Sequence, residues 1–146
     1  MNIVLEEYIP LKIMFCKDKE PINYISYSQD KYSLLEISVG VNSRQIHKIM
    51  LLLSKEYSIE EKSLKIQESI KEDILMDSGN VQCTCFETTI YMNGVKIVLS
   101  KEKRERYIKV DSIYFGVSCS NEIVEICVCE MSPSEVLHLK RELELQ

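Results

Sequence analysis

Apolar and polar positions alternate along much of the chain, and this alternation predicts β-strands. Near the start, Leu11, Ile13 and Phe15 are separated by single residues, a spacing that places their side chains on one face of a strand. After the charged turn KDKEP, the β-favouring run over 22–27 predicts a second strand. The first part of the chain therefore reads as strands joined by polar connections.

The stretch LLEISVGVNSRQIHKIMLLLS, residues 34–54, predicts a β-hairpin. Its first strand covers 34–41, residues 42–44 supply polar turn chemistry, and the return strand covers 45–53. On the return strand we assign two apolar faces, one with Ile46, Met50 and Leu52 and the other with Ile49, Leu51 and Leu53. Because both faces are apolar near its end, the return strand is expected in the centre of a sheet.

Residues 55–77 mix acidic, basic and apolar side chains, and their pattern allows two interpretations. Ile66, Ile70 and Ile74 recur every four residues, which is the spacing of an apolar helical stripe and predicts a middle helix. No strong N-cap precedes the stripe, so a long ordered excursion packed on the sheet is the alternative.

From residue 81 the strand pattern returns, over VQCTCFETTIYM, VKIVLS, YIKVDSIYFGVSC and IVEICVCEM. Asn93-Gly94 separates the first two of these runs. This dipeptide predicts a two-residue type I′ hairpin turn, because both central residues of that turn need positive φ.

The end of the chain predicts a helix. SPSE at 132–135 is a capping box with proline at the first helical position, and Val136, Leu139 and Leu143 form an apolar stripe after it. Together the elements predict one α+β domain over 1–146. It would contain a mostly antiparallel β-sheet of about eight strands, the C-terminal helix and, in one interpretation, the middle helix.

Charge and composition restrict the kinds of partner that the protein can bind. The 146 residues carry 18 Lys and Arg against 23 Asp and Glu, for a net charge of −5. This balance disfavours nucleic-acid binding, which needs clustered cations, and suits a basic protein partner. Glu6 and Glu7 interrupt the N-terminal apolar run, and no apolar run is long enough to span a bilayer. We therefore expect a cytoplasmic protein with no membrane partner.

Two cysteine pairs, Cys83 with Cys85 and Cys127 with Cys129, raise the question of a metal site. On a strand, residues i and i+2 lie about 6.5 Å apart, whereas tetrahedral zinc with bonds of about 2.3 Å brings its sulfurs closer than that. Small buried apolar residues are the favoured interpretation, since cysteine is among the most buried residue types. A metal site and a regulated disulfide are the alternatives.

Candidate catalytic groups are few. The two histidines, His47 and His138, lie beside no signature of an activated thiol, and no HExxH motif or glycine-rich phosphate loop is present. We therefore predict no catalytic residue, no bound metal and no cofactor. Carboxylates are plentiful; they are expected on the solvated surface or, alternatively, on an acidic face for a basic partner. That face would use Glu60, Glu61, Glu68, Glu72, Asp73 and Asp77.

Parts of the sequence resemble immunity proteins of bacterial polymorphic-toxin and contact-dependent growth inhibition systems. The resemblance rests on the apolar-apolar-Glu-Ile-x-Val strand, polar hairpin and leucine-rich return over 34–53. It also rests on IVEICVCEMSPSEVLHLKREL over 123–143, a late strand that runs into a short helix. It implies a small cytosolic protein that binds one cognate toxin, and it carries over no catalytic or contact residues.

The function that these observations favour is a non-enzymatic immunity protein that neutralises a cognate toxin domain, such as a basic nuclease, by steric occlusion. A small cysteine-dependent metal protein or enzyme is one alternative. A structural or regulatory subunit of another assembly is the other. The sequence does not give the oligomeric state.

Overall fold

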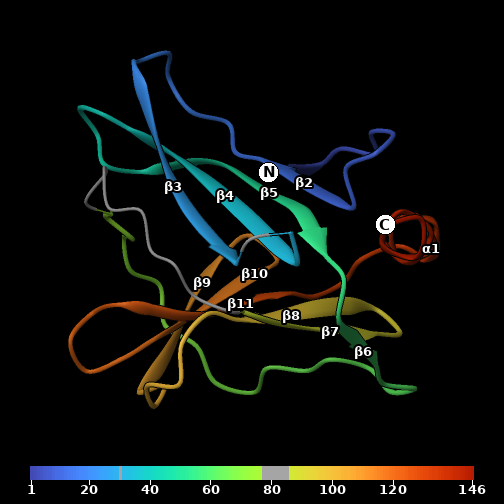
Figure 1. The fold of residues 1–146 in the computed structure, drawn as a ribbon. Coiled ribbons are helices and arrows are strands. Elements are labelled where there is room, and N and C mark those ends of the chain that lie inside the picture. The colour runs from blue at the N-terminus through green and yellow to red at the C-terminus, as the bar shows by residue number, and fades with distance from the viewer. Residues whose placement is uncertain (30, 77–85) are drawn as a thin grey trace. The chain divides into compact units, whose positions relative to one another are not determined.

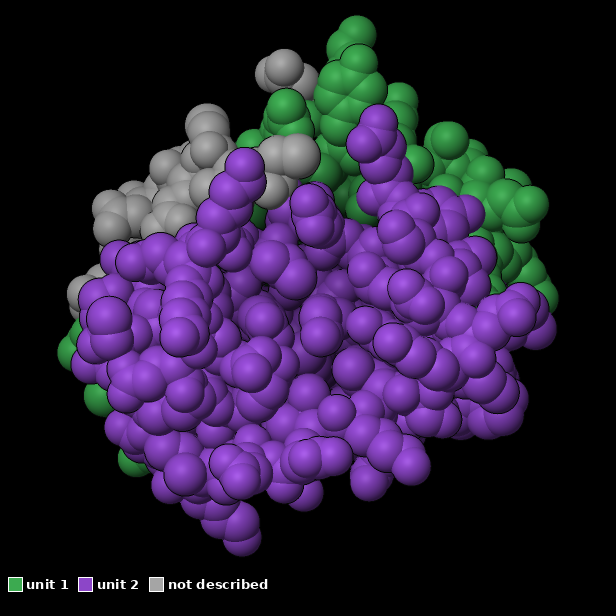
Figure 2. All heavy atoms as spheres, turned by 90° about the horizontal axis from the view of Figure 1, so that it is seen from below, with its two compact units in different colours: residues 1–55, 73–85, 138–146 green, residues 56–72, 86–137 purple. Residues whose placement is uncertain are grey.

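A computed structural model describes residues 1–29, 31–76 and 86–146. These residues fall into two compact units that are interleaved along the chain and coloured separately in Figure 2. Unit 1 comprises Met1–Lys55, Asp73–Cys85 and His138–Gln146, and unit 2 comprises Glu56–Glu72 and Phe86–Leu137. The single domain over 1–146 stays a prediction, and the two units are described separately below.

Unit 1 contains a five-stranded sheet in the order β1-β2-β5-β4-β3, with every pair antiparallel (Figure 1). The predicted hairpin is confirmed as β4 and β5, and β5 is the central strand, as its two apolar faces indicated. The strands are β1 (Asn2–Ile3), β2 (Leu11–Met14), β3 (Ile22–Gln29), β4 (Ser33–Gly40) and β5 (Ile46–Ser54).

Two register shifts interrupt the β4–β5 hairpin and correct the predicted faces of the return strand, and the one nearer the tip is a β-bulge at His47. Ser38 pairs with Lys48, but the next residue, Val39, pairs with Ile46, so His47 has no opposite residue. The extra residue moves Ile46 to the buried face that also carries Ile49 and Leu51. The assignment of Ile46 to the face of Met50 was therefore wrong, because the sequence pattern assumed an unbroken period of two. The assignment of Leu53 to the face of Leu51 was wrong for the same reason, since Leu51 pairs with Leu35 but Leu53 pairs with the next residue, Leu34.

Unit 2 contains a six-stranded sheet in the order β6-β7-β8-β11-β10-β9 (Figure 1). Strands β6 and β7 are parallel and the other pairs are antiparallel. The strands are β6 (Tyr57–Ile59), β7 (Glu87–Tyr91), β8 (Gly94–Val98), β9 (Arg106–Val110), β10 (Ile113–Val117) and β11 (Ile123–Val128).

The α+β class is confirmed, but the single sheet of about eight strands is wrong. The described residues form two sheets, and one of them is mixed. Two short edge strands, β1 and β6, carry too few residues for a visible alternation. The run over 107–119 folds back on itself as β9 and β10, at a turn where Asp111 has a φ of 55°.

The turn between β7 and β8 lies one residue earlier than Asn93-Gly94 predicts. Tyr91 pairs with Gly94, so Met92 and Asn93 form the loop. Neither loop residue has a positive φ, and the type I′ assignment was wrong. Glycine at 94 serves the approach of another strand instead, because a Cβ there would overlap the carbonyl oxygen of Val128 on β11.

The C-terminal helix is confirmed as α1 (Pro133–Glu144). Its capping box is complete: the backbone N–H of Ser132 donates to Glu135 Oε1 at 2.8 Å, and that of Glu135 donates to Ser132 Oγ at 3.2 Å. The predicted stripe of Val136, Leu139 and Leu143 is buried. Over the residues that the structure describes, no helix has the length and apolar character needed to cross a bilayer.

The predicted middle helix is absent from the described part of 55–77, which ends at residue 76. Residues 60–72, here called the strap, belong to unit 2 and form neither helix nor strand, apart from one isolated β-bridge. Ile70 is not part of a helical stripe: it forms a parallel bridge to Ile108 on edge strand β9. With no cap and with β-branched residues at the stripe positions, pairing with a sheet edge was the stronger option.

Candidate functional site

Leu64 and Ile70 are two of the points at which hydrogen bonds fix the backbone of the strap to unit 2. At Leu64, the backbone N–H donates to Asn93 Oδ1 at 2.6 Å, and Asn93 Nδ2 donates back to the Leu64 carbonyl at 3.2 Å. At Ile70, the N–H donates to the Tyr107 carbonyl at 3.0 Å, and Lys109 N–H donates to the Ile70 carbonyl at 2.9 Å. The segment between these anchors therefore has a defined course without any regular secondary structure of its own.

The strap also buries apolar side chains on one face of the unit 2 sheet. Leu64, only 6% exposed, packs with Cys127 and Cys129, and Ile66 lies against the same cluster. Three tyrosines complete it: Tyr91, Tyr107 and Tyr114. The expectation of buried structural cysteines is confirmed for Cys127 and Cys129, whereas Cys83 and Cys85 lie outside the described residues.

The Cys127 thiol lies in surroundings that keep it protonated. Burial raises its pKa to about 12, and the nearby Glu125 carboxylate adds to the rise. Burial likewise raises the pKa of Tyr107, whose hydroxyl donates to Glu125 Oε1 at 2.6 Å. Within the described ranges, no cluster of three or more His, Cys, Asp or Glu side chains is placed to hold a metal ion. These thiols therefore act as packing groups in this cluster, since a reactive or ligating cysteine needs its thiolate.

Four of the six predicted contact residues lie on the strap with exposed side chains: Glu60, Glu61, Glu68 and Glu72. Asp73 is exposed in unit 1, and Asp77 lies outside the described residues. Among these four, Glu72 forms an ion pair with a described residue: its Oε2 lies 3.5 Å from Arg106 Nε. The strap thus buries Leu64, leaves Ile70 46% exposed and turns most of its carboxylates towards solvent.

Exposed apolar side chains flank the acidic start of the strap. Ile59, at the end of β6, is 53% exposed, and Met92 in the β7–β8 loop is 63% exposed. The Met92 N–H donates to the Lys62 carbonyl at 2.9 Å, which places Met92 beside the strap. Ile59 directly precedes Glu60, whose N–H donates to the Ile90 carbonyl at 2.8 Å. Apolar side chains rimmed by charges are the usual anatomy of a protein-binding surface.

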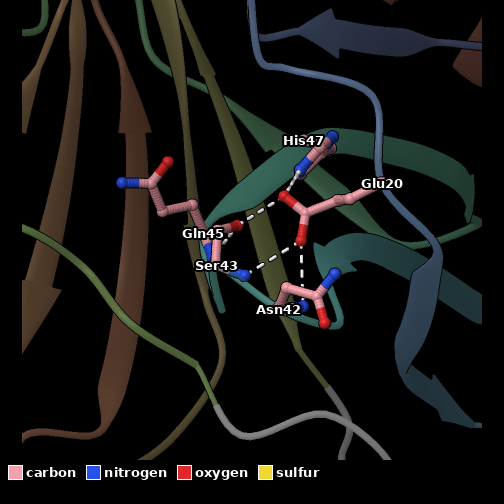
Figure 3. Close-up of polar contacts among 5 residues, drawn as sticks. All are labelled: Glu20, Asn42, Ser43, Gln45 and His47. Carbon is pink, nitrogen blue, oxygen red and sulfur yellow. Dashed lines mark hydrogen bonds and ion pairs between the residues drawn. The ribbon is translucent and has the colours of Figure 1, made fainter.

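A second polar site lies in unit 1 and was not predicted from the sequence. Glu20 reaches from the β2–β3 connection to the tip of the β4–β5 hairpin (Figure 3). One carboxylate oxygen accepts the backbone N–H groups of Asn42 and Ser43, each at 2.9 Å. The other oxygen accepts Ser43 Oγ at 2.6 Å and contacts His47 Nε2 at 2.9 Å.

The backbone around Glu20 leaves space for its carboxylate and directs a histidine towards it. Gly40 has no side chain, and a Cβ there would collide with that carboxylate. The β-bulge turns His47 towards Glu20, on the strand face opposite Ile46 and Ile49. Sequence reasoning missed the site because its members are far apart in the chain and carry no motif.

The hydrogen bonds to Glu20 hold its pKa well below the ordinary value of 4.5, at about 2. The side-chain and backbone hydrogen bonds from Ser43 are the largest causes, and those from His47 and Asn42 add to them against the opposing effect of desolvation. The Ser43 hydroxyl donates to the carboxylate and not to the histidine, so the group lacks the nucleophile–base contact of a hydrolase. Its evident role is to hold the hairpin tip against the β2–β3 connection.

We expect the substitution Glu20→Gln to reduce stability in a pH-dependent manner. A carboxyl whose folded pKa is lowered stabilises the protein above its unfolded pKa, and the stabilisation is lost as pH falls. The gap in thermal unfolding midpoint between wild type and Glu20→Gln should thus be full above pH 4.5 and close as pH falls towards about 2. The exposed carboxylate of Glu7 provides a control: a Glu7→Gln gap should be small throughout. A Glu20→Gln gap that is constant over this range would contradict the assignment.

Comparison with known proteins gives no further identification. A scan of the chain against protein-family models finds no match, and a search of curated proteins finds none.

Proposed function

We propose that the protein is a non-enzymatic immunity protein that binds a cognate bacterial toxin domain in the cytoplasm and blocks it by steric occlusion. The observation that carries this proposal is the strap: its carboxylates are exposed, and hydrogen bonds fix its backbone at Leu64 and Ile70. The sequence resemblance over 34–53 and 123–143 supports the same class of protein.

A fixed strap favours binding for two physical reasons. Its backbone hydrogen bonds are already made, so less conformational entropy is lost when a partner docks than with a free loop. Its carboxylates attract a basic surface and orient the encounter, which raises the association rate and rejects acidic partners. A toxin that acts on nucleic acid carries such a basic surface, since it must bind phosphates.

The contact surface that we propose centres on the acidic start of the strap. There, Glu60 and Glu61 directly follow the exposed Ile59 in the chain, and the exposed Met92 is hydrogen-bonded through its backbone to Lys62. In protein interfaces, apolar anchors supply most of the affinity, while the charged rim supplies orientation and specificity. This combination favours a protein partner over a small-molecule substrate at this surface.

The proposal is tested with the C-terminal domain of the protein encoded immediately upstream of this protein's gene, which we expect to be the toxin. The two proteins are co-expressed in a bacterial host, and growth and co-purification are measured. We expect growth to be rescued and the two chains to elute together in a stable complex. A protein that neither protects the host nor forms a complex would rule out this function.

A further inference from the structure

A pocket in unit 1 lies beside Glu20 and is separate from the strap. Its volume is about 550 Å³, within the range of about 300–1,000 Å³ that is usual for small-molecule sites. Phe15, Lys17 and Lys19 line it from the β2–β3 connection, and Ser38 and Lys48 line it from β4 and β5. The pocket therefore combines an apolar wall with several cationic groups.

The Ser38 side chain is the feature of this pocket that indicates a bound ligand. It is fully buried, at 0% exposure, and its hydroxyl has no hydrogen-bond partner among the described residues. Buried polar side chains in proteins almost always have a partner, so an unpartnered one calls for a water or a ligand from outside the chain. Because Ser38 lines the pocket, a molecule held there is placed to supply that partner.

The charges around the pocket favour an anion. Lys17, Lys19 and Lys48 line it, and none makes an ion pair with a residue that the structure describes. Asp18 and Glu20 are the carboxylates in the lining. Glu20 already accepts four hydrogen bonds from the hairpin tip and His47, so its oxygens have no capacity left for a ligand.

The β-bulge adds to this arrangement. It places His47 and Lys48, two successive residues, along the lining of the same pocket, whereas successive residues of a regular strand point to opposite faces. His47 is held by Glu20 through Nε2, and its other ring nitrogen has no partner within the described part of the chain. Bulges recur beside functional sites because they redirect side chains in this way.

We propose that this pocket binds a small organic anion. Lys17, Lys19 and Lys48 would neutralise its carboxylate or phosphate group, the Ser38 hydroxyl would hydrogen-bond to it, and Phe15 and Ile22 would pack against its apolar part. The inference does not depend on toxin binding, because it rests on residues of unit 1 alone.

The test is a titration of the isotope-labelled protein followed by NMR, with benzoate, phenyl phosphate and the neutral benzamide as probes. We expect saturable shifts of the Ser38 and Lys48 amide signals with the two anions, weakened by added salt, and no saturable shift with benzamide. Tighter binding of phenyl phosphate than of benzoate would assign the site to phosphate esters, and the reverse order would assign it to carboxylates. An equal response to benzamide, or no saturable response to either anion, would overturn the proposal.

Variants identify the site within the protein. Ser38→Ala and Lys48→Met should each weaken benzoate binding by about tenfold, the loss expected for one charge-assisted or buried hydrogen bond. Lys31→Met removes an exposed lysine of the same unit outside the pocket and should leave the affinity unchanged. The amide spectrum of each variant away from its substitution shows whether the fold is retained. If all three variants retain the wild-type spectrum and bind benzoate like the wild type, the pocket is not the site.

Discussion

Replacing Gly94 by alanine is expected to destabilise the protein by about 3 kcal/mol, a large effect for a single added methyl group. The new Cβ would overlap the backbone carbonyl oxygen of Val128. A backbone atom within the sheet cannot rotate away as a side chain can, so β8 and β11 would have to separate where Val95 pairs with Val128. In a protein of this size the thermal unfolding midpoint should fall by about 10 °C.

Gly116→Ala is the matched control for this prediction. A Cβ at Gly116 would meet side-chain atoms of Glu125 at 3.0 Å and of Arg104 at 3.1 Å. Those atoms can move by a few tenths of an ångström, so the cost should stay near about 1 kcal/mol. Equal destabilisation by the two substitutions, measured by chemical denaturation, would show that the proximity of Gly94 to Val128 is not a packing constraint.

The substitution Leu64→Ala should weaken the packing of the strap on the unit 2 sheet. Leu64 is 6% exposed and packs against Cys127 and Cys129, and truncation of a buried leucine costs about 2–5 kcal/mol. Since the strap covers these cysteines, we also expect faster alkylation of Cys127 and Cys129, measured for each cysteine by peptide mass spectrometry. The exposed thiols of Cys16 and Cys119 provide an internal reference.

Leu75→Ala is the control for the strap prediction. Leu75 is 51% exposed, and substitution of an exposed apolar residue usually changes stability by less than about 0.5 kcal/mol. Its effect on the labelling of Cys127 should be negligible. If Leu64→Ala left both stability and labelling unchanged, the strap would not be anchored by Leu64.

The local elements of this fold were predictable where the sequence signal is local. The hairpin over 34–54 and the capped helix α1 each depend on residues within about twenty positions of one another, and periodicity and capping chemistry report such relations directly. The buried state of Cys127 followed from the β-favouring run around it. These features need no knowledge of the remainder of the chain.

The features that the sequence did not predict depend on distant partners. The bulge that redirects His47 requires β4 as its reference, and the path of the strap is decided by Asn93 and by the edge of β9. Glu20 meets its hairpin partners 22 to 27 positions away. In each case a tertiary contact overrode the local pattern, as the three isoleucines of the absent middle helix illustrate.

Measurement of toxin affinity with paired charge reversals tests the central claim most directly. Glu60→Lys/Glu61→Lys alters the strap, and Glu87→Lys/Glu105→Lys changes the net charge equally at exposed positions of unit 2 outside the strap. If the strap is the docking surface for the proposed toxin, calorimetry should show affinity for the domain encoded upstream weakened at least about tenfold in the first variant and about twofold or less in the second. Equal weakening in both variants, or none in the first, would contradict binding through the strap.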